Sequence, residues 1–449
     1  KPALTFFLQT NSQHYLPYLL LLILLWWSIN LIWRSSSWKL GGIRLPPGPR
    51  PLPIIGNILE LGDKPHRAIA KLSKLYGPVL TIKLGAITTL VISSPEAAKE
   101  ALQKNDQHLS SRQVPDTAKA TGHHDKSVVW LPAFDKWKLL RKVCTVQMLT
   151  TRKLDETQFL RCKKLEELAG FIRESCQQGH CVNIGKAAFT TVFNSISNTL
   201  FSIDLAHHDA RSSQEFKDLV WGVMEETGKP NVSDFFPVLR GFDPEGACRR
   251  ISEVASSPSN DVLDSLINLK ERGELSGDDI KSLLLDLFLA GVDSNSSLLE
   301  WAMAEQLHNP EKIARAREEL DQVVGGDGGT LQEPDIARLP YLQTIVKETL
   351  RLHPPVPLLI PHKAESDIEI CRYRLPRHAQ VLVNGWAMGR DPNVWPDQDS
   401  FSPERFLGRE IDFKGRDFEL IPFGSRRRMC PGIPLTYRMV HPILASLLC

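Results

Sequence analysis

From Pro65 onward, apolar residues recur every three to four positions over most of the chain, which is the period of an amphipathic helix. This pattern predicts helices at 66–76, 95–103, 339–353 and from 431 onward. β-Branched residues around Gly85 indicate a hairpin at 79–92, and short apolar runs indicate strands at 356–360 and 380–384. We therefore predict a mainly α-helical protein with a small β-rich subdomain.

A long helix is predicted to start near Asp278. Ser276 and Asp279 have the spacing of a capping box, and the apolar stretch that follows extends over 283–289. The next helix should begin at Asn309-Pro310, with Asn as its cap and Pro in its first turn.

Small and polar residues interrupt the apolar stretch of this long helix at Ala290, Gly291, Asp293 and Ser294. Glycine lowers helix propensity by about 1 kcal/mol, and serine competes for backbone hydrogen bonds. A local widening that receives a small ligand would explain all four residues. Close packing against a neighbouring helix would explain Ala290 and Gly291, but not the Asp293-Ser294 pair.

The N-terminal segment 16–33 is almost wholly apolar and, as a helix, would be about 27 Å long, close to the thickness of a bilayer core. Only Lys1 precedes it, whereas several basic residues follow, which places the next domain in the cytosol. A cleaved signal peptide is the alternative, but the run is longer than a usual signal core and Arg34 follows it directly. We predict an anchor at 1–34, a basic and Pro-rich linker at 35–53 and one globular domain at 54–449.

Composition narrows the choice of partners and compartment. The 449 residues carry a net charge of +2, so nucleic acid is not an implied partner. The eight cysteines have no regular spacing, although Cys176 and Cys181 could meet in a turn. We predict a reducing compartment for the main body. His123-His124-Asp125 could bind a metal, but adjacent histidines do not share a helix face, so a solvated loop is favoured.

The stretch 422–432 holds one cysteine, Cys430, in a short turn rich in Gly and Pro, with a basic side chain two residues upstream. A thiolate in such a turn could bind a macrocycle iron, which needs only one ligand from the protein. The alternative is an ordinary loop cysteine that packs as a small apolar group, and for an isolated cysteine this is the more common case. Two other residue pairs do not indicate a function by themselves. Trp137 and Arg141 share a helix face and could simply be a cation over an aromatic ring, and Glu348 and Arg351 could be a weak surface ion pair.

The spacing of Phe423, Arg428, Cys430 and Gly432 resembles the haem-binding loop of the cytochrome P450 family. Further family motifs occur in the expected order at 137–141, 290–294, 348–351 and 403–406, and the resemblance extends from about residue 45 to the end. The segments 45–49, 389–392 and 412–415 are most similar to plant microsomal members, in particular terpenoid hydroxylases related to geraniol hydroxylase and ferruginol synthase.

This resemblance implies the cytochrome P450 fold and a haem b whose iron is axially bound by Cys430. It also implies a haem site that includes Phe423, Gly432, Ala290 and Gly291. The haem propionates would be bound by Arg112, Trp137, Arg141, His362 and Arg428, since arginine forms charge-assisted bonds with carboxylates. Asp293 and Ser294 would deliver protons in the oxygen-binding groove. Glu348, Arg351 and Arg405 would form a buried network that holds the cysteine loop.

The implied activity is hydroxylation of a small apolar substrate, a terpenoid, with O2. The electrons would come from NADPH through a separate NADPH-cytochrome reductase. The protein would be a single-pass protein of the endoplasmic reticulum membrane, in contact with lipid, with its catalytic domain in the cytosol. Arg426, Arg427 and Lys138 could contact the reductase; a solvated basic face is the alternative.

Several positions depart from the family pattern. Arg426 stands where the family usually has Gly, Ser294 where it has Thr, and Pro442 lies inside the helix expected after the cysteine. The stretch 250–260 is short, the sequence lacks an initiating Met, and the family's terminal strands are not found before Cys449. These features lead to an alternative hypothesis: a haem-poor or catalytically impaired membrane-anchored homologue, or a fragment.

Overall fold

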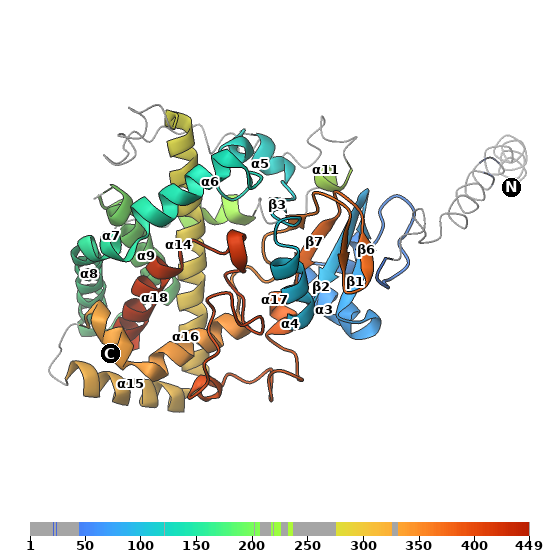
Figure 1. Cartoon of the computed structure of the whole chain (residues 1–449). Helices are drawn as coiled ribbons and strands as arrows, with labels where there is room; N and C mark the ends of the chain where they lie inside the picture. The colour runs from blue at the N-terminus through green and yellow to red at the C-terminus, as the bar shows by residue number, and fades with distance from the viewer. Residues whose placement is uncertain are drawn as a thin grey trace, which may run out of the picture.

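The computed structural model describes Leu21, Leu24 and residues 45–120, 122–201, 203–206, 217–218, 220–225, 232–236, 275–325 and 331–448. A large helical region lies beside a smaller β-rich region (Figure 1), which confirms the predicted fold class. Apart from Leu21 and Leu24, the predicted anchor segment lies outside the described residues, and so does the stretch 250–260. Within the described part of the chain, no helix has the length and apolar character needed to cross a membrane.

Helix α14 (Gly277–His308) forms the centre of the helical region and packs against several long helices (Figure 1). Its partners are α9 (Ile184–Phe201), α15 (Pro310–Val324), α16 (Pro340–Leu352) and α18 (Ile433–Leu448). Helix α8 (Gln158–Gln177) packs against α9 and α18. The predicted capping box at Ser276 and Asp279 is present. Asn309 does not cap α15, because its side chain donates to the carbonyl oxygen of Glu305 at 2.7 Å.

The remaining helical elements are short. They are α2 (Ile58–Leu61), α3 (Pro65–Tyr76), α4 (Pro95–Lys99), η1 (Glu100–Lys104), α5 (Asp116–Ala120), η2 (His123–Asp125), α6 (Asp135–Lys142), η3 (Val143–Met148), α7 (Thr151–Glu156), α11 (Val232–Phe235), η5 (Glu333–Arg338), α17 (Gly385–Met388), η6 (Pro403–Phe406) and η7 (Arg426–Arg428). The predicted helix at 95–103 is α4 continued by the π-helix η1.

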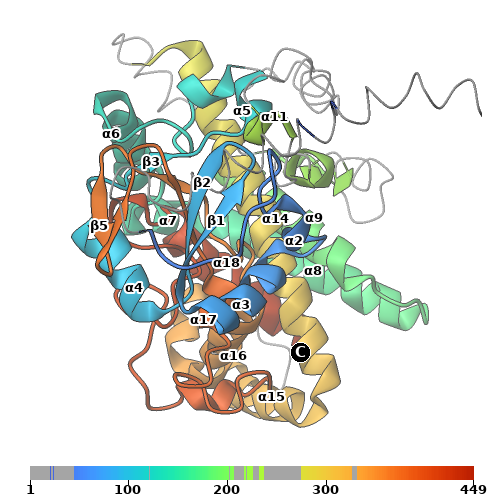
Figure 2. The same ribbon diagram turned by 90° about the vertical axis from the view of Figure 1, so that its right-hand side faces the viewer.

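A five-stranded sheet has the order β1 (Val79–Leu84), β2 (Ile87–Ile92), β7 (Gln380–Val383), β4 (His362–Lys363) and β3 (Ser111–Arg112). The predicted hairpin is confirmed, with Gly85 at φ 53° between its strands. Strands β2 and β7 are parallel, which joins segments far apart in the sequence. A separate pair consists of β5 (Ile368–Ile370) and β6 (Tyr373–Leu375). Figure 2 shows β1 and β2 in front of the long helices.

The strand predicted at 356–360 is wrong, because that segment forms turns and the strand begins only at His362. Pro354, Pro355, Pro357 and Pro361 have no N–H group to donate to a sheet. Leu359 has a φ of 51°, which no regular strand allows. By contrast, the strand predicted at 380–384 is confirmed as β7.

Candidate active site

The cysteine loop connects η7 to α18 and is closed by its own backbone. The N–H of Cys430 donates to the carbonyl oxygen of Phe423 at 2.9 Å, and the N–H of Gly432 donates to Cys430 Sγ at 3.3 Å. Burial raises the pKa of the Cys430 thiol, whereas the Gly432 N–H and the charge of Arg141 lower it. The Gly432 N–H is therefore positioned to stabilise a thiolate at Cys430. Helix α18 begins three residues after the cysteine, at Ile433.

The loop forces Arg426 into a left-handed backbone conformation, with φ 58°. Gly424, two residues earlier, has φ 70°. Glycine adopts this region freely, but a side chain makes it unfavourable by about 1–2 kcal/mol per residue. The structure thus agrees with the expectation that position 426 suits Gly. Pro442 lies inside α18, as expected from the sequence.

Arg428 is held above Trp137 by backbone oxygens. Its guanidinium lies 4.6 Å from the centroid of the Trp137 ring. Its Nε donates to Ser110 O at 2.6 Å, and a terminal nitrogen donates to Leu131 O. The cation over Trp137 is therefore Arg428 and not Arg141, which donates instead to the backbone oxygen of Met429 in the cysteine loop.

Arg112 and His362 face each other across the antiparallel pair of β3 and β4. Arg112 donates to Ile360 O at 2.6 Å, and His362 Nδ1 is 2.7 Å from Leu109 O. Burial, and then the charge of Arg428, lower the pKa of Arg112 to about 9. Burial, and then the charge of Arg112, hold the pKa of His362 well below its usual value.

Anions in the described part of the chain balance this cluster of cations only weakly, because Asp106, which acts on Arg428, is paired with Arg427. No carboxylate there lies within ion-pair distance of Arg112, Arg141 or Arg428, and Arg112 Nε is buried without a hydrogen-bond partner. The pKa of Arg428 is lowered to about 10 by burial and then by Arg141 and Arg427. Buried like charges destabilise a fold unless an anion joins them. The cluster therefore fits a ligand that carries carboxylates.

The middle of α14 contacts α9. A Cβ atom at Gly291 would lie 2.8 Å from Ile196 Cδ1, so a larger residue here would have to displace the end of the Ile196 side chain. Ala290 is exposed, and Ser294 Oγ donates to its carbonyl oxygen at 2.6 Å. Burial, and then the charge of Glu300, raise the pKa of Asp293. Packing thus explains Gly291, while the exposed Ala290 and the Asp293-Ser294 pair still fit a ligand-facing position.

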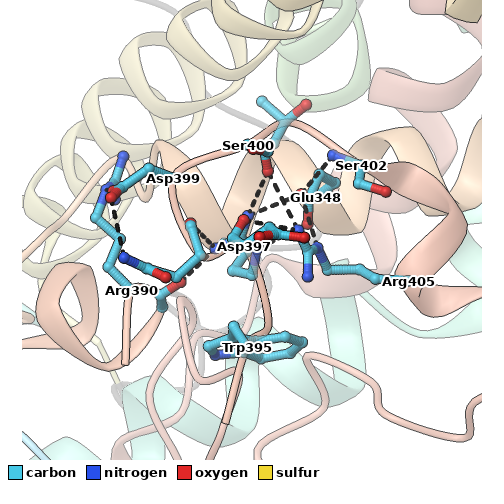
Figure 3. Close-up of polar contacts among 12 residues, drawn as sticks. Glu348, Arg390, Trp395, Asp397, Asp399, Ser400, Ser402 and Arg405 are labelled. Atoms are coloured by element: carbon cyan, nitrogen blue, oxygen red, sulfur yellow. Dashed lines mark hydrogen bonds and ion pairs between the residues drawn. The ribbon is translucent and has the colours of Figure 1, made fainter. Parts of the chain in front are cut away.

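Glu348, Arg351 and Arg405 form the buried network that the sequence predicted (Figure 3). Glu348 is fully buried and accepts from Arg351 at 2.7 Å and from Arg405 at 3.0 Å. Both arginines also donate to backbone oxygens in the segment that leads up to η6. These oxygens belong to Gly389, Pro396, Asp397, Gln398 and Ser400. The network therefore orders segment 389–402, and among the described residues none of its hydrogen bonds reaches the cysteine loop directly.

Comparison with known proteins places the chain in a family. The family model for cytochrome P450 matches residues 46–260 and 247–449. The chain belongs to the cytochrome P450 family. It is 48% identical to cytochrome P450 monooxygenase 76AD131 of Lophophora williamsii, with 97% of this chain and 92% of the relative covered. It is 47% identical to geraniol 8-hydroxylase of Catharanthus roseus, over 96% of this chain and 92% of that one.

A solved zebrafish cytochrome P450 with progesterone has the same fold. It superposes with a TM-score of 0.71 at 24% identity and covers 86% of this chain and 92% of its own. Cytochromes P450 use haem with a cysteine thiolate on the iron and electrons from a reductase. The chain is therefore an oxidoreductase of the monooxygenase class. Its buried or half-buried arginines without a carboxylate at ion-pair distance, and a cysteine with a donor at its sulfur, fit this cofactor.

One buried residue near this cytochrome P450 site escaped the sequence reasoning. Asp286 on α14 accepts from His123, Ser127 and Val128. The segment 123–125 is thus a 3-10 turn that His123 ties to α14, whereas Asp125 is exposed, so the expected solvated loop is only partly correct. The sequence did contain an indication of this residue, because Asp286 is the only carboxylate within the apolar run 283–289.

The basic face expected to contact a reductase is partly paired. Arg427 binds Asp106 at 2.7 Å and Lys138 binds Asp135 at 3.1 Å, whereas Arg426 is exposed. Surface pairs of this kind contribute little to stability and exchange readily for other partners. Reductase docking at this face stays a prediction.

Proposed function

We propose that the chain is a haem-thiolate monooxygenase in which Cys430 binds the iron and the substrate is a small terpenoid alcohol. The observation that carries the assignment is the position of Cys430 Sγ. It accepts the Gly432 N–H, and the backbone oxygen of its neighbour Met429 accepts from Arg141, a half-buried cation without a carboxylate at ion-pair distance. An ordinary packed cysteine would need neither the donor nor the cations.

Several residues of the chain would bind the haem. Arg112, Arg141 and Arg428, with His362, would bind the two carboxylates of haem by charge-assisted hydrogen bonds. Trp137 donates its only N–H to Val128 O, so it would act by stacking against Arg428. Bound haem supplies the one-electron and dioxygen chemistry, with NADPH electrons delivered by a separate reductase.

Residues of the loop and of α14 would enclose the reaction. Phe423 and Gly432 would keep water from the sulfur, and Ala290 and Gly291 would leave room beside α14. Because the pKa of Asp293 is raised, this carboxyl holds a proton more readily at neutral pH and could donate it through Ser294.

The proposed substrate class rests on relatives. Geraniol 8-hydroxylase of Catharanthus roseus is 47% identical and drimenol monooxygenase of Persicaria hydropiper is 44% identical to this chain. We expect hydroxylation of geraniol or of drimenol when the protein is combined with an NADPH-dependent reductase. Incubation of both alcohols, followed by mass spectrometry, tests this. Turnover of neither, by a protein with full haem, would contradict the proposed substrate class.

The iron ligand is tested by the absorption of the reduced protein with carbon monoxide, which identifies a thiolate ligand. Cys430→Ser should abolish the thiolate band. Cys144→Ser is a matched control, because burial raises the pKa of the Cys144 thiol to about 12 and keeps it neutral. A thiolate band that survives in Cys430→Ser would exclude Cys430 as the ligand.

The alternative is a haem-poor homologue, which Arg426 at φ 58° and Pro442 inside α18 favour. The same spectrum decides between the two. Haem in less than about a tenth of the purified wild-type chains, after expression with excess haem precursor, would support the alternative.

We further propose attachment to the endoplasmic reticulum membrane by one N-terminal helix, with the catalytic domain in the cytosol. The apolar run 16–33 and the basic residues after it support this. Exposed apolar side chains near the start of the described globular part, such as Ile54 (75% exposed) and Leu75 (77%), would add lipid contact. Deletion of residues 1–44 should reduce co-sedimentation with vesicles and keep haem binding. Loss of haem on this deletion would show that the segment belongs to the fold.

A further inference from the structure

Asp286 is a buried carboxylate that binds a single loop. It lies on α14 with 7% of its surface exposed. His123 Nε2 lies 2.7 Å from its Oδ1, Ser127 Oγ donates to Oδ1 at 2.9 Å, and the N–H of Val128 donates to Oδ2 at 2.8 Å. Both carboxylate oxygens are thus used, and every one of these partners lies within six residues of the others. Asp286 therefore fixes the start of segment 127–131 on α14.

The same segment supplies the acceptors for Arg428 and Trp137. Val128 O accepts from Trp137 Nε1 at 3.0 Å and from Arg428 at 3.4 Å, and Leu131 O accepts from Arg428 as well. Within the segment, Ser127 Oγ accepts the N–H of Val129 at 3.0 Å, and Ser127 O accepts the N–H of Leu131 at 3.0 Å. A continuous set of bonds therefore runs from Asp286 to the Arg428 guanidinium.

The position of Arg428 depends strongly on these oxygens. It lies in a cluster where burial and two neighbouring arginines disfavour its charge, so its backbone acceptors replace the missing anion in part. If Val128 and Leu131 shift, Arg428 loses two acceptors and the stacking on Trp137 changes. Asn at position 286 would have one acceptor oxygen in place of two, and its NH2 would face a donor.

We propose that Asp286 is a positioning residue for the cofactor. It fixes segment 127–131 so that the carbonyl oxygens of Val128 and Leu131 hold Arg428, stacked on Trp137, in the orientation that binds a haem carboxylate. This inference rests on the proposed function, because it assumes that Arg428 contacts haem.

The test is the rate of haem loss from the holoprotein to excess apomyoglobin. Asp286→Asn should lose haem about tenfold faster than the wild type. Asp278→Asn is the matched control: Asp278 is on the same helix and binds Lys126 of the same loop at 2.9 Å, but it is 65% exposed. Its rate should stay within about twofold of the wild type. Equal rates for the two variants would overturn the proposal.

A double-mutant cycle separates positioning from a general loss of stability. If Asp286 acts through Arg428, Asp286→Asn should change the rate less than about twofold in an Arg428→Ala background. If the double variant loses haem at a rate accelerated by the product of the two single effects, Asp286 only stabilises the fold. That result would overturn the proposal. Should Asp286→Asn fail to fold, Ser127→Ala removes one donor and should show a smaller acceleration with the same dependence on Arg428; full multiplication with Arg428→Ala would again overturn the proposal.

The proposed function can fail separately. A wild-type chain that binds no haem, or an Arg428→Ala variant that loses haem at the wild-type rate, would contradict the assignment of the haem site. If only the Asp286 proposal fails, the wild-type chain should still bind haem and Arg428→Ala should still lose it faster than the wild type.

Discussion

Arg112 stands directly opposite His362 across β3 and β4, and both side chains are buried. Arg112 Nε has no hydrogen-bond partner, and Arg428 adds a second positive charge nearby. The charge of Arg112 in turn helps to hold the pKa of His362 below its usual value. The haem-free protein therefore contains an unbalanced charge at a place where bound haem would provide carboxylates.

Replacement of Arg112 should have opposite effects on the haem-free and haem-bound forms. Arg112→Met should raise the free energy of unfolding of the haem-free chain, because it removes an uncompensated buried charge. It should also speed haem loss about tenfold or more. Urea unfolding and haem transfer measure the two effects, with the exposed Arg374→Met as a control.

His441 on α18 should make the fold sensitive to acid. Burial lowers its pKa from 6.5 to about 4. Between these values the unfolded state binds a proton and the folded state does not, so stability falls as pH decreases, by up to about 1.4 kcal/mol per pH unit. His441→Gln should reduce this slope in unfolding measurements between pH 6.5 and 4.5. The exposed His308→Gln should leave the slope unchanged; the same slope in His441→Gln would refute the assignment.

Glu348 should be among the residues least tolerant of change. Glu348→Gln would leave Arg351 and Arg405 without the carboxylate that they share, at a cost of about 3–5 kcal/mol. Thermal unfolding should show a large loss of stability or no folded protein. Asp367→Asn breaks a surface pair with Arg374 at 3.1 Å and should cost far less, because exposed ion pairs contribute little to stability. Similar losses of stability for both variants would mean that burial of the network does not increase its contribution to stability.

Local sequence signals predicted the elements well and the contacts between them poorly. The capping box at Ser276 and the glycine at position 85 act over a few residues, so the helix start and the hairpin could be read directly. The family resemblance assigned Arg112 and His362 to one site, but it did not predict that they pair across two strands, because 250 residues separate strands whose register depends on the whole sheet. Asp286 and the stacking of Arg428 on Trp137 were missed, since periodicity does not show which loop a side chain will bind.

Position 426 offers a direct test of backbone strain. Arg426→Gly should stabilise the protein by about 1 kcal/mol and raise haem occupancy, because φ 58° suits Gly. Arg426→Ala removes the charge and keeps the strained conformation, so it separates the two effects. Thermal unfolding and the ratio of haem to protein provide the measurements. Equal stability of the Gly and Ala variants would show that the turn tolerates a side chain.

Ser294 should limit how efficiently oxygen consumption leads to product. Its Oγ donates to Ala290 O at 2.6 Å, a bond that threonine can also make, but serine has no second heavy atom on Cβ to restrict χ1. A hydroxyl that leaves this rotamer would deliver protons at the wrong place or time. Ser294→Thr should therefore raise the ratio of hydroxylated product to NADPH consumed, and Ser294→Ala should lower it. Both ratios are measured with the reductase present, at equal haem content. If Thr and Ala give the wild-type ratio, the hydroxyl at position 294 takes no part in proton delivery.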